Sequence, residues 1–533
     1  MTLSKAKVFV RDATGLVREF SALDAIILAT GAMVGPTWVP LFAGEWFLFP
    51  GVNIPASFVL IGLLSLGMGF YYVLITGIMP RSGAGGYVAL SRVIHPALGM
   101  AMSFVFVIVN LLDCAFIANL TVTVGVAGPL GAFAALTKDA GLQSLATTLG
   151  TPTGGFAVGS VMIIAIGLLM IAGARVLKRV NLIAFILGTL GFLLVIAITV
   201  SVSQPQFQGI FDNFAGPGAY QNMISTAHTA GWSIPSDWVT PTLLSLPLSW
   251  FGLLGFSYNT YWSGEVRKVT RNMSLSVVFS IIFTAFFFSI IALLMAQSFG
   301  LDFLTSAGYL FNAAPAQYTL SVPPWVNVFV ALVNSNPLVN GLLIVSYICW
   351  GYFLLVSYYM IASRHILAWS FDRAFPSALA SVSDRFHSPV RAIILTAVIS
   401  IVALTFFAFL PTILAPVNLT FLLIVAFMLD GVAGMALPWT KKALFESAPA
   451  MCKKKFAGIP LLALLGAYTV IFIVALFLLS LFNPAIIGPF GSATGGTALA
   501  LLIIGAATYF VMKAYYASKG LDISLAYKEL PPE

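Results

Sequence analysis

Long apolar runs alternate with short polar connections along most of the chain. A membrane-spanning helix needs about 20 mostly apolar residues, and twelve runs of about this length occur. They are residues 22–43, 57–79, 97–126, 154–173, 181–203, 243–263, 273–297, 339–363, 390–410, 415–438, 459–482 and 494–516. The pattern predicts an all-α integral membrane protein with twelve transmembrane helices.

Two of the connections, 204–242 and 298–338, are much longer than the others. Both contain Pro, Gly and aromatic residues, so we expect folded caps there rather than irregular loops. Within the second cap, residues 302–311 predict a short helix that lies across one mouth of the protein.

Two apolar runs contain residues that interrupt a helix. Gly35, Pro36 and Pro40 lie in the first run, and Gly252 and Gly255 lie in the sixth. Proline removes a backbone donor and clashes with the preceding turn, and glycine weakens a helix interior. Close helix packing is the alternative explanation for a glycine-rich run. However, the first and sixth runs correspond in two five-helix halves, which is typical of a secondary transporter with inverted repeats.

Basic residues are distributed unevenly over the predicted connections. With an intracellular N-terminus, all but one of the 25 Lys and Arg residues lie on the same side, and the exception is Lys138. Basic residues near the ends of spans accumulate in the cytoplasm. We therefore expect a protein of the cell membrane with both termini in the cytoplasm.

This topology divides the chain into successive parts. They are a cytoplasmic segment (1–21), a first five-helix repeat (22–203), an extracellular loop (204–242), a second five-helix repeat (243–438) containing an extracellular loop (298–338), two further helices (459–516) and a cytoplasmic tail (517–533).

Composition supports a lipid bilayer as the main partner. The chain is 60% hydrophobic and only 8% charged, whereas soluble domains carry roughly 25% charged residues. The net charge of +8 comes from short connections, so it does not indicate nucleic-acid binding. No histidine spacing typical of a metal site occurs, and no cofactor or enzyme activity is expected.

Four stretches occur in a characteristic order. They are Gly31-Ala-Met-Val-Gly35, Pro80-Arg-Ser-Gly-Ala-Gly-Gly-Tyr87, the stretch from Gly255 through Glu265 to Asn272, and Ser363-Arg364 with Asp372-Arg373 and Ser388-Pro389-Val390. Together they resemble the amino acid–polyamine–organocation superfamily of permeases. The resemblance implies a five-plus-five inverted repeat of the leucine-transporter-like fold, followed by two C-terminal helices.

The resemblance also implies a substrate site at the two interrupted helices. Its residues would be Met33, Val34, Gly35, Pro36, Thr37, Phe251, Gly252, Leu253, Leu254 and Gly255. The positive end of a half-helix would hold the substrate carboxylate, and free carbonyl groups would accept from its ammonium group. Phe251 stands at the position of an aromatic gate, although core or lipid packing is an equal alternative.

Departures from the family pattern bear on substrate and coupling. Pro36 and Thr37 replace small residues, Ser257 stands where an acidic residue is common, and the fifth helix has no Lys. The expected pocket offers mainly apolar side chains, and an unpaired buried charge costs several kcal/mol. We therefore expect a neutral amino acid as substrate.

Several polar residues lie within or beside the predicted spans. Asp113, beside Cys114, is expected to face the interior and bind a coupling proton, since a carboxylate inside a membrane is costly. The alternative is a permanently protonated Asp113 bonded to Asn110 or to a neighbouring helix. Asp430 is a second candidate. Ser357 and Ser363 are candidate sodium ligands. At the cytoplasmic side we expect Asp24 to act as a gate or helix cap and Glu265 to pair with an Arg such as Arg364. Glu45 is expected to be solvated.

These features predict a secondary active permease for amino acids, driven by protons or sodium through alternating access. An exchanger of amino acids or polyamines is one alternative. A non-transporting substrate sensor on the same fold is another, although sensors usually carry a long cytoplasmic extension. A multi-span membrane enzyme would need a cluster of His, Asp or Glu at an inner face, which the sequence does not contain.

The topology makes a direct prediction for labelling from outside the cell. In single-cysteine variants, a membrane-impermeant thiol reagent should modify Lys138→Cys and leave Lys453→Cys unmodified, because the membrane separates the two positions. Permeabilised cells provide the control, since both positions should then react. Labelling of position 453 but not position 138 on intact cells would contradict the orientation.

Overall fold

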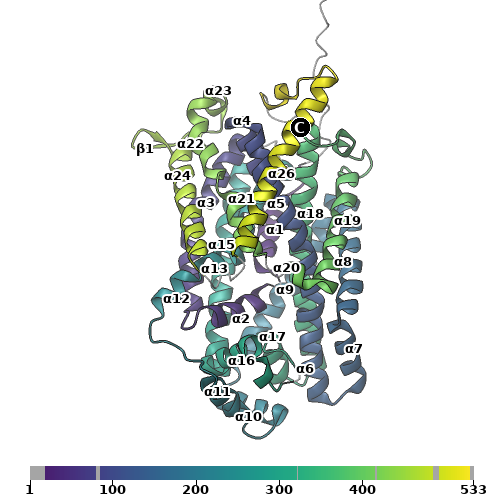
Figure 1. The fold of residues 1–533 in the computed structure, drawn as a ribbon, viewed down its shortest axis with the longest axis vertical. Helices are drawn as coiled ribbons and strands as arrows, with labels where there is room; N and C mark the ends of the chain where they lie inside the picture. The colour runs from purple at the N-terminus through teal and green to yellow at the C-terminus, as the bar shows by residue number, and fades with distance from the viewer. Residues whose placement is uncertain are drawn as a thin grey trace, which may run out of the picture.

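Long helices run side by side between two ends of the molecule (Figure 1). This computed structural model describes residues 18–35, 37–79, 85–320, 322–414, 417–483 and 491–528. We call the end with the C-terminal tail the tail end. The opposite, cap end is formed by helices that include α6 (Gly128–Thr137), α7 (Ala140–Gly150), α10 (Gln204–Ala215) and α11 (Ala219–Thr229).

The first five predicted spans are helical. They are α1 (Ala22–Val34) with α2 (Trp38–Leu48), α3 (Ile54–Ile78), α5 (Pro96–Leu120), α8 (Pro152–Ala172) and α9 (Ala174–Val200). The short α4 (Gly85–Val93) precedes α5, which continues into α6 through the π-helical turn η1 (Thr121–Ala127). Polar caps start these helices: Asn53 accepts from Ala56 N–H at 3.0 Å, and Thr151 accepts from Gly154 N–H at 3.0 Å.

The remaining spans follow the predicted order. They are α12 (Val239–Leu244), α13 (Leu246–Leu253) and α14 (Gly255–Tyr258) for the sixth, α15 (Val269–Met295), α18 (Pro337–Phe371), α19 (Val390–Phe409), α21 (Leu419–Phe427) with α22 (Asp430–Thr440), α24 (Leu461–Leu481) and α26 (Gly491–Ser518).

Shorter elements complete the two ends. They are η2 (Asn259–Tyr261), η3 (Ser263–Glu265), η4 (Ala296–Gly300), α16 (Leu301–Ala313), η5 (Pro315–Gln317), α17 (Val326–Val333), η6 (Ser377–Ala380), α20 (Pro411–Leu414), α23 (Lys442–Ser447), β1 (Lys455–Phe456), β2 (Ile459–Pro460) and η7 (Ile523–Tyr527). The helices α10, α11, α16 and α17 lie in the two long connections, so the prediction of folded caps is confirmed. Strands β1 and β2 form an antiparallel pair with Lys455 opposite Pro460.

The helices have the length and the surface of membrane spans. In the described part of the chain, ten helices are long and apolar enough to cross a membrane, and α1 with α2 forms a further, bent span. The sixth segment is divided into helices too short to qualify alone, so the arrangement is consistent with twelve crossings. Val161, Leu168 and Phe286 are each at least 60% exposed, as expected for side chains that face lipid. The chain is therefore a multi-pass membrane protein.

The basic residues are separated in space as well as in sequence. Lys138 directly follows α6 at the cap end and lines a cavity of about 670 Å³ with residues of α10 and α11. The other described Lys and Arg residues belong to elements or connections toward the tail end (Figure 1).

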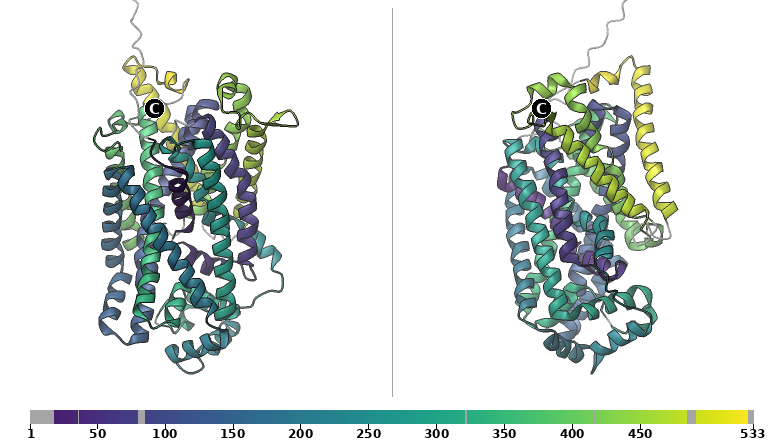
Figure 2. Two further views of the ribbon diagram at one scale, coloured as in Figure 1. Left: turned by 180° about the vertical axis from the view of Figure 1, so that it is seen from behind. Right: turned by 90° about the vertical axis from the view of Figure 1, so that its left-hand side faces the viewer.

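The two interrupted spans lie inside the bundle. Helix α1 packs against α14, α15 and α18, and α3 packs against α15. Helix α18 in turn packs against α5 and α9. The last span, α26, packs mainly on α5 and lies at the periphery (Figure 2). Protein rather than lipid therefore surrounds the backbone at the interruptions.

Candidate functional site

The first interruption is a sharp change of backbone direction after Val34. Helices α1 and α2 are bent by 41° relative to each other. Gly35 has φ 36° and ψ 174°, a conformation that glycine adopts more easily than other residues. A Cβ atom at Gly35 would overlap the Leu354 side chain of α18. Pro36 lies outside the described residues, and Thr37 is buried without capping α2.

The second interruption differs from the predicted unwinding. Helix α13 ends at Leu253 and α14 begins at Gly255, but Leu254 keeps helical angles of φ −62° and ψ −23°. Its N–H donates to Phe251 O at 3.3 Å, and Ser257 N–H donates to Leu254 O at 3.0 Å. These three-residue bonds tighten the helix without opening it. Glycine permits a break but does not impose one, and this stretch has no proline.

The two interruptions face each other directly. A Cβ atom on Gly255 would stand 2.6 Å from the Ala32 carbonyl carbon and 2.7 Å from the Met33 nitrogen. Only a glycine lets the two backbones approach so closely. Met33, Val34, Leu253 and Leu254 are all buried around this contact. The structure thus places Gly255 of the predicted site against Met33, whereas Gly252 faces Leu41, Phe58 and Phe288.

Two adjacent aromatic residues of the sixth segment, Trp250 and Phe251, differ in burial. Phe251, the predicted gate, is half-buried, whereas its neighbour Trp250 is fully buried. The Trp250 ring lies 5.9 Å from the Phe427 ring of α21, and its indole N–H has no partner among the described residues. Sequence reasoning missed Trp250, because successive helical side chains point about 100° apart and the sequence alone does not show which faces inward.

Asp113 is a buried carboxylate without a partner. It lies on α5, is 1% exposed, and neither of its oxygens has a hydrogen-bond partner in the described structure. Asn110 donates instead to Phe106 O at 2.7 Å, so the alternative of an Asn110–Asp113 bond is not found. Tyr258 of α14 and Tyr358 of α18 lie within electrostatic range of Asp113. Asp113 thus lies near two helices that meet at the interruptions.

The neighbouring polar candidates are already engaged. Cys114 is buried beside Ser400 of α19. Asp430 accepts from Tyr72 O–H at 2.8 Å, and its carbonyl accepts from Tyr71 O–H. Ser357 O–H donates to Phe353 O at 2.9 Å within α18. Each of these side chains therefore has a polar neighbour or a hydrogen-bond partner, whereas the Asp113 oxygens have none among the described residues.

The tail end is closed by a buried ion pair. Arg364 of α18 donates from Nε and Nη2 to Glu265 Oε1 at 3.0 and 2.7 Å, and both side chains are at most 7% exposed. The predicted pairing of Glu265 with Arg364 is confirmed. Helix α18 continues to Phe371, beyond the predicted end of this span at residue 363, and His365 is therefore buried within the helix.

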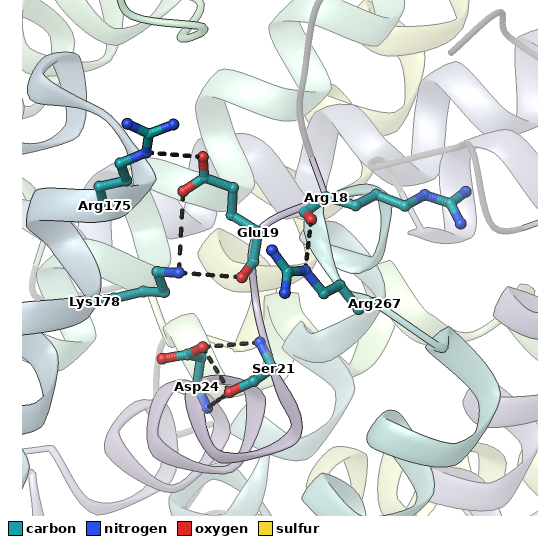
Figure 3. Close-up of polar contacts among 7 residues, drawn as sticks. All are labelled: Arg18, Glu19, Ser21, Asp24, Arg175, Lys178 and Arg267. Carbon is teal, nitrogen blue, oxygen red and sulfur yellow. Dashed lines mark hydrogen bonds and ion pairs between the residues drawn. The ribbon is translucent and has the colours of Figure 1, made fainter.

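The N-terminal segment adds a second closure beside this pair. Phe20 N–H donates to Glu265 O at 2.8 Å, and Arg267 N–H donates to Phe20 O at 2.9 Å. Figure 3 shows Glu19 between Arg175 and Lys178 of α9, at 3.3 and 4.0 Å.

Asp24 caps α1 in the same region. Its carboxylate accepts from Ser21 N–H at 2.8 Å, and its own N–H donates to Ser21 Oγ at 3.3 Å (Figure 3). These bonds form a capping box, so of the two expected roles the structure provides the cap.

The expectation that Glu45 is solvated is wrong. Glu45 is 0% exposed, and Ser249 O–H lies 2.8 Å from its Oε1 atom. The predicted span ended at residue 43, whereas α2 continues to Leu48 and lies beneath α16 and α17. The cap helices therefore cover a carboxylate that the sequence placed at the membrane surface.

Comparison with known proteins agrees with this architecture. The sequence profile described as "Amino acid permease" matches residues 20–512. The structure is similar to the crystal structure of MhsT in complex with L-phenylalanine, with a TM-score of 0.55, 16% sequence identity, and coverage of 87% of this chain and 99% of that chain. At this identity the likeness concerns the fold. No curated protein sequence matches the chain.

The contact between the interruptions predicts the effect of one methyl group. Gly255→Ala should destabilise the protein by about 1–3 kcal/mol, because the backbone of α1 cannot move aside cheaply. Thermal unfolding of the detergent-solubilised protein measures the loss. Gly44→Ala in α2 is the matched control, since no atom lies within 4 Å of a Cβ at that position. Equal melting temperatures for Gly255→Ala and the wild type would contradict the close approach.

Proposed function

Because the chain belongs to the amino acid permease family, we propose that it is a secondary active transporter for neutral amino acids in the cell membrane. Both termini face the cytoplasm in this proposal, as the distribution of basic residues indicates. The transporter works by alternating access, in which the interrupted spans move against the remaining helices.

The observation that carries this proposal is the interruption after Val34, against which Gly255 of the sixth segment packs. A helix that begins inside the protein has free N–H groups and a positive dipole end. Helix α2 begins in this way after Thr37, with no side-chain cap and no acidic residue in its first turn. A substrate carboxylate would supply the missing acceptors, and the carbonyl groups that end α1 would accept from the ammonium group.

The apolar lining of the interruptions supports a neutral substrate. Met33, Val34, Leu253 and Leu254 carry no charge, and all four are buried. A charged substrate side chain would need a desolvated partner of opposite sign. Asp113 could serve as such a partner for a cationic side chain, but we assign it to the coupling ion instead.

The contacts at the tail end correspond to a state closed toward the cytoplasm. Glu265 and Arg364 are buried as a pair, and the backbone of residue 20 is bonded to residues 265 and 267. Release of substrate to the cytoplasm requires these contacts to separate. A charged side chain that loses its partner is strongly destabilised if it stays buried. We therefore expect water to reach Glu265 and Arg364 when they separate.

A proton bound at Asp113 is the coupling ion in this proposal. A carboxylate in the membrane interior is stabilised by a proton when no cation is present, and both Asp113 oxygens lack a partner. Sodium is the alternative coupling ion: the Ser357 hydroxyl donates to Phe353 O at 2.9 Å and keeps its oxygen lone pairs for a cation. Protonation at Asp113 would favour one access state, and its release would favour the other.

Uptake into proteoliposomes tests the function and the substrate class together. The wild-type protein should accumulate labelled alanine or leucine under an inward proton gradient, because the site provides for a carboxylate, an ammonium group and an apolar side chain. Separate sodium gradients and protein-free liposomes are the controls. Saturable uptake of arginine or a polyamine without alanine or leucine would contradict the neutral substrate. Exchange without net accumulation would support the exchanger instead.

A second prediction concerns Asp113 alone. Asp113→Asn keeps the size of the side chain and removes the titrating group, so accumulation driven by a proton gradient should be abolished while substrate exchange remains measurable. Asp430→Asn is the matched control, because that carboxyl group is buried but bonded to Tyr72, and it should retain accumulation. Wild-type accumulation by Asp113→Asn would show that Asp113 is structural and that another ion or residue provides the coupling.

A further inference from the structure

A second buried carboxyl group lies on the cap side of the interruptions. Glu45 of α2, Ser249 of α13 and Ser57 of α3 are each 0% exposed. The Ser249 oxygen lies 2.8 Å from Glu45 Oε1 and 3.1 Å from Ser57 Oγ, and Ser57 O–H donates to Ile54 O at 2.8 Å. These three side chains join the outer halves of both interrupted spans to α3.

The number of protons in this chain of oxygen atoms indicates the state of Glu45. A serine hydroxyl donates one proton, and Ser57 uses its proton for Ile54 O. If Glu45 were ionised, Ser249 would donate to it rather than to Ser57 or to Ser245 O at 3.3 Å, and the Ser249–Ser57 contact would need the proton that Ser57 gives to Ile54 O. If Glu45 is protonated, it donates to Ser249, Ser249 donates to Ser57, and Ser57 donates to Ile54 O. Each hydroxyl group then has one acceptor.

The surroundings of Glu45 contain no charge that could replace this proton. Glu45 forms no ion pair with a described residue, and its Oε2 atom has no hydrogen-bond partner. The neighbouring helices α13 and α17 carry no titratable side chain. On α3, Tyr71 and Tyr72 bind Asp430 at the far end. On α16, Asp302 binds His228 and Tyr309 binds Ala230 O.

An aromatic layer separates Glu45 from the interruptions. The rings of Phe42, Phe58 and Phe288 pack with centroid distances of 5.1–6.1 Å. Phe42 lies one turn closer to Gly35 than Glu45 does. A Cβ at Gly252, three residues beyond Ser249, would contact both Phe58 and Phe288. Proton exchange at Glu45 is therefore directed to the cap side rather than to the substrate site.

From these observations we propose that Glu45 is a proton-binding site that holds the cap end closed. The proton on its carboxyl group completes the Glu45–Ser249–Ser57 chain and keeps α2 and α13 against α3. When this proton passes to water at the cap end, Glu45 is left as an unpaired negative charge in an apolar site. A buried unpaired charge is unfavourable, so the closed packing of α2 and α13 against α3 is destabilised. The cap end then opens as the medium on that side becomes more alkaline. The role of this opening in substrate access rests on the proposed transport function.

Spin-label distances test the proposal without requiring transport. Gly44 of α2 and Gly341 of α18 are suitable label positions, because no atom lies within 4 Å of a Cβ at either position. The labels are attached to Gly44→Cys and Gly341→Cys in protein whose native cysteines have been replaced. In this background, raising the pH should increase the fraction of molecules with the longer distance between the labels at positions 44 and 341.

Two variants in this background, Glu45→Gln and Glu446→Gln, separate the possible outcomes. Glu45→Gln keeps the acceptor oxygen and a donor but cannot ionise, so it should lose the pH-dependent shift. The exposed Glu446→Gln should retain it. Parent protein and variants all carry Asp113→Asn, so that a proton bound at Asp113 does not contribute to the shift. The same shift in Glu45→Gln as in the parent protein, or no shift in the parent protein, would overturn the proposal. If Glu45→Gln does not fold, Ser57→Ala provides the test, since loss of the chain should move the midpoint to lower pH.

The wild-type uptake experiment separates this proposal from the proposed function. Absence of uptake with a normal pH-dependent distance shift would contradict transport and leave the Glu45 site supported. Uptake with an unchanged shift in Glu45→Gln would contradict the Glu45 site and leave transport supported.

Discussion

A helix that is interrupted inside a membrane leaves backbone N–H and C=O groups that lipid cannot satisfy. The interruption after Val34 is possible because other helices surround it. Helices α14, α15 and α18 pack around α1, and Gly255 brings the backbone of α14 against Ala32 and Met33. These helices thus enclose one stretch of irregular backbone. The same enclosure surrounds the start of α2 with protein, which is where we propose that substrate binds.

The buried charged groups fall into two classes according to their partners. Toward the tail end they are paired: Glu265 binds Arg364, and Arg92 Nη2 donates to Asp372 Oδ1 at 2.7 Å. Asp113 and Glu45 lack cationic partners among the described residues. A buried pair is costly to separate but needs no ion from solution. An unpaired carboxyl group instead depends on a proton, which makes it sensitive to the medium that it can reach.

Much of the fold follows from properties of the sequence that are local. Apolar length defines the spans, and Gly35 marks the first interruption because few other residues accept its backbone angles. The capping role of Asp24 could be anticipated from Ser21 three residues earlier. The pairing of Glu265 with Arg364 followed from the cost of leaving either side chain unpaired in the interior.

The remaining features depend on packing that the sequence does not contain. Leu254 stays helical because neighbouring residues tighten their hydrogen bonds, although glycines lie on both sides of it. Glu45 is buried because distant cap helices cover α2, and Trp250 rather than Phe251 is fully enclosed. Periodicity within one segment cannot predict contacts made by residues far away in the chain.

The bridge between Phe20 and Val266 has a mechanical consequence. Its two hydrogen bonds connect the start of the first span to the connection before α15 through main-chain atoms alone. A rotation of α1 is therefore transmitted to the sixth and seventh spans at their ends nearer the C-terminal tail, without passing through the interruption at Gly35. The main chain at Phe20 thus couples α1, α14 and α15 mechanically. Because both hydrogen bonds are made by main-chain atoms, they do not depend on which side chains residues 20, 265 and 267 carry.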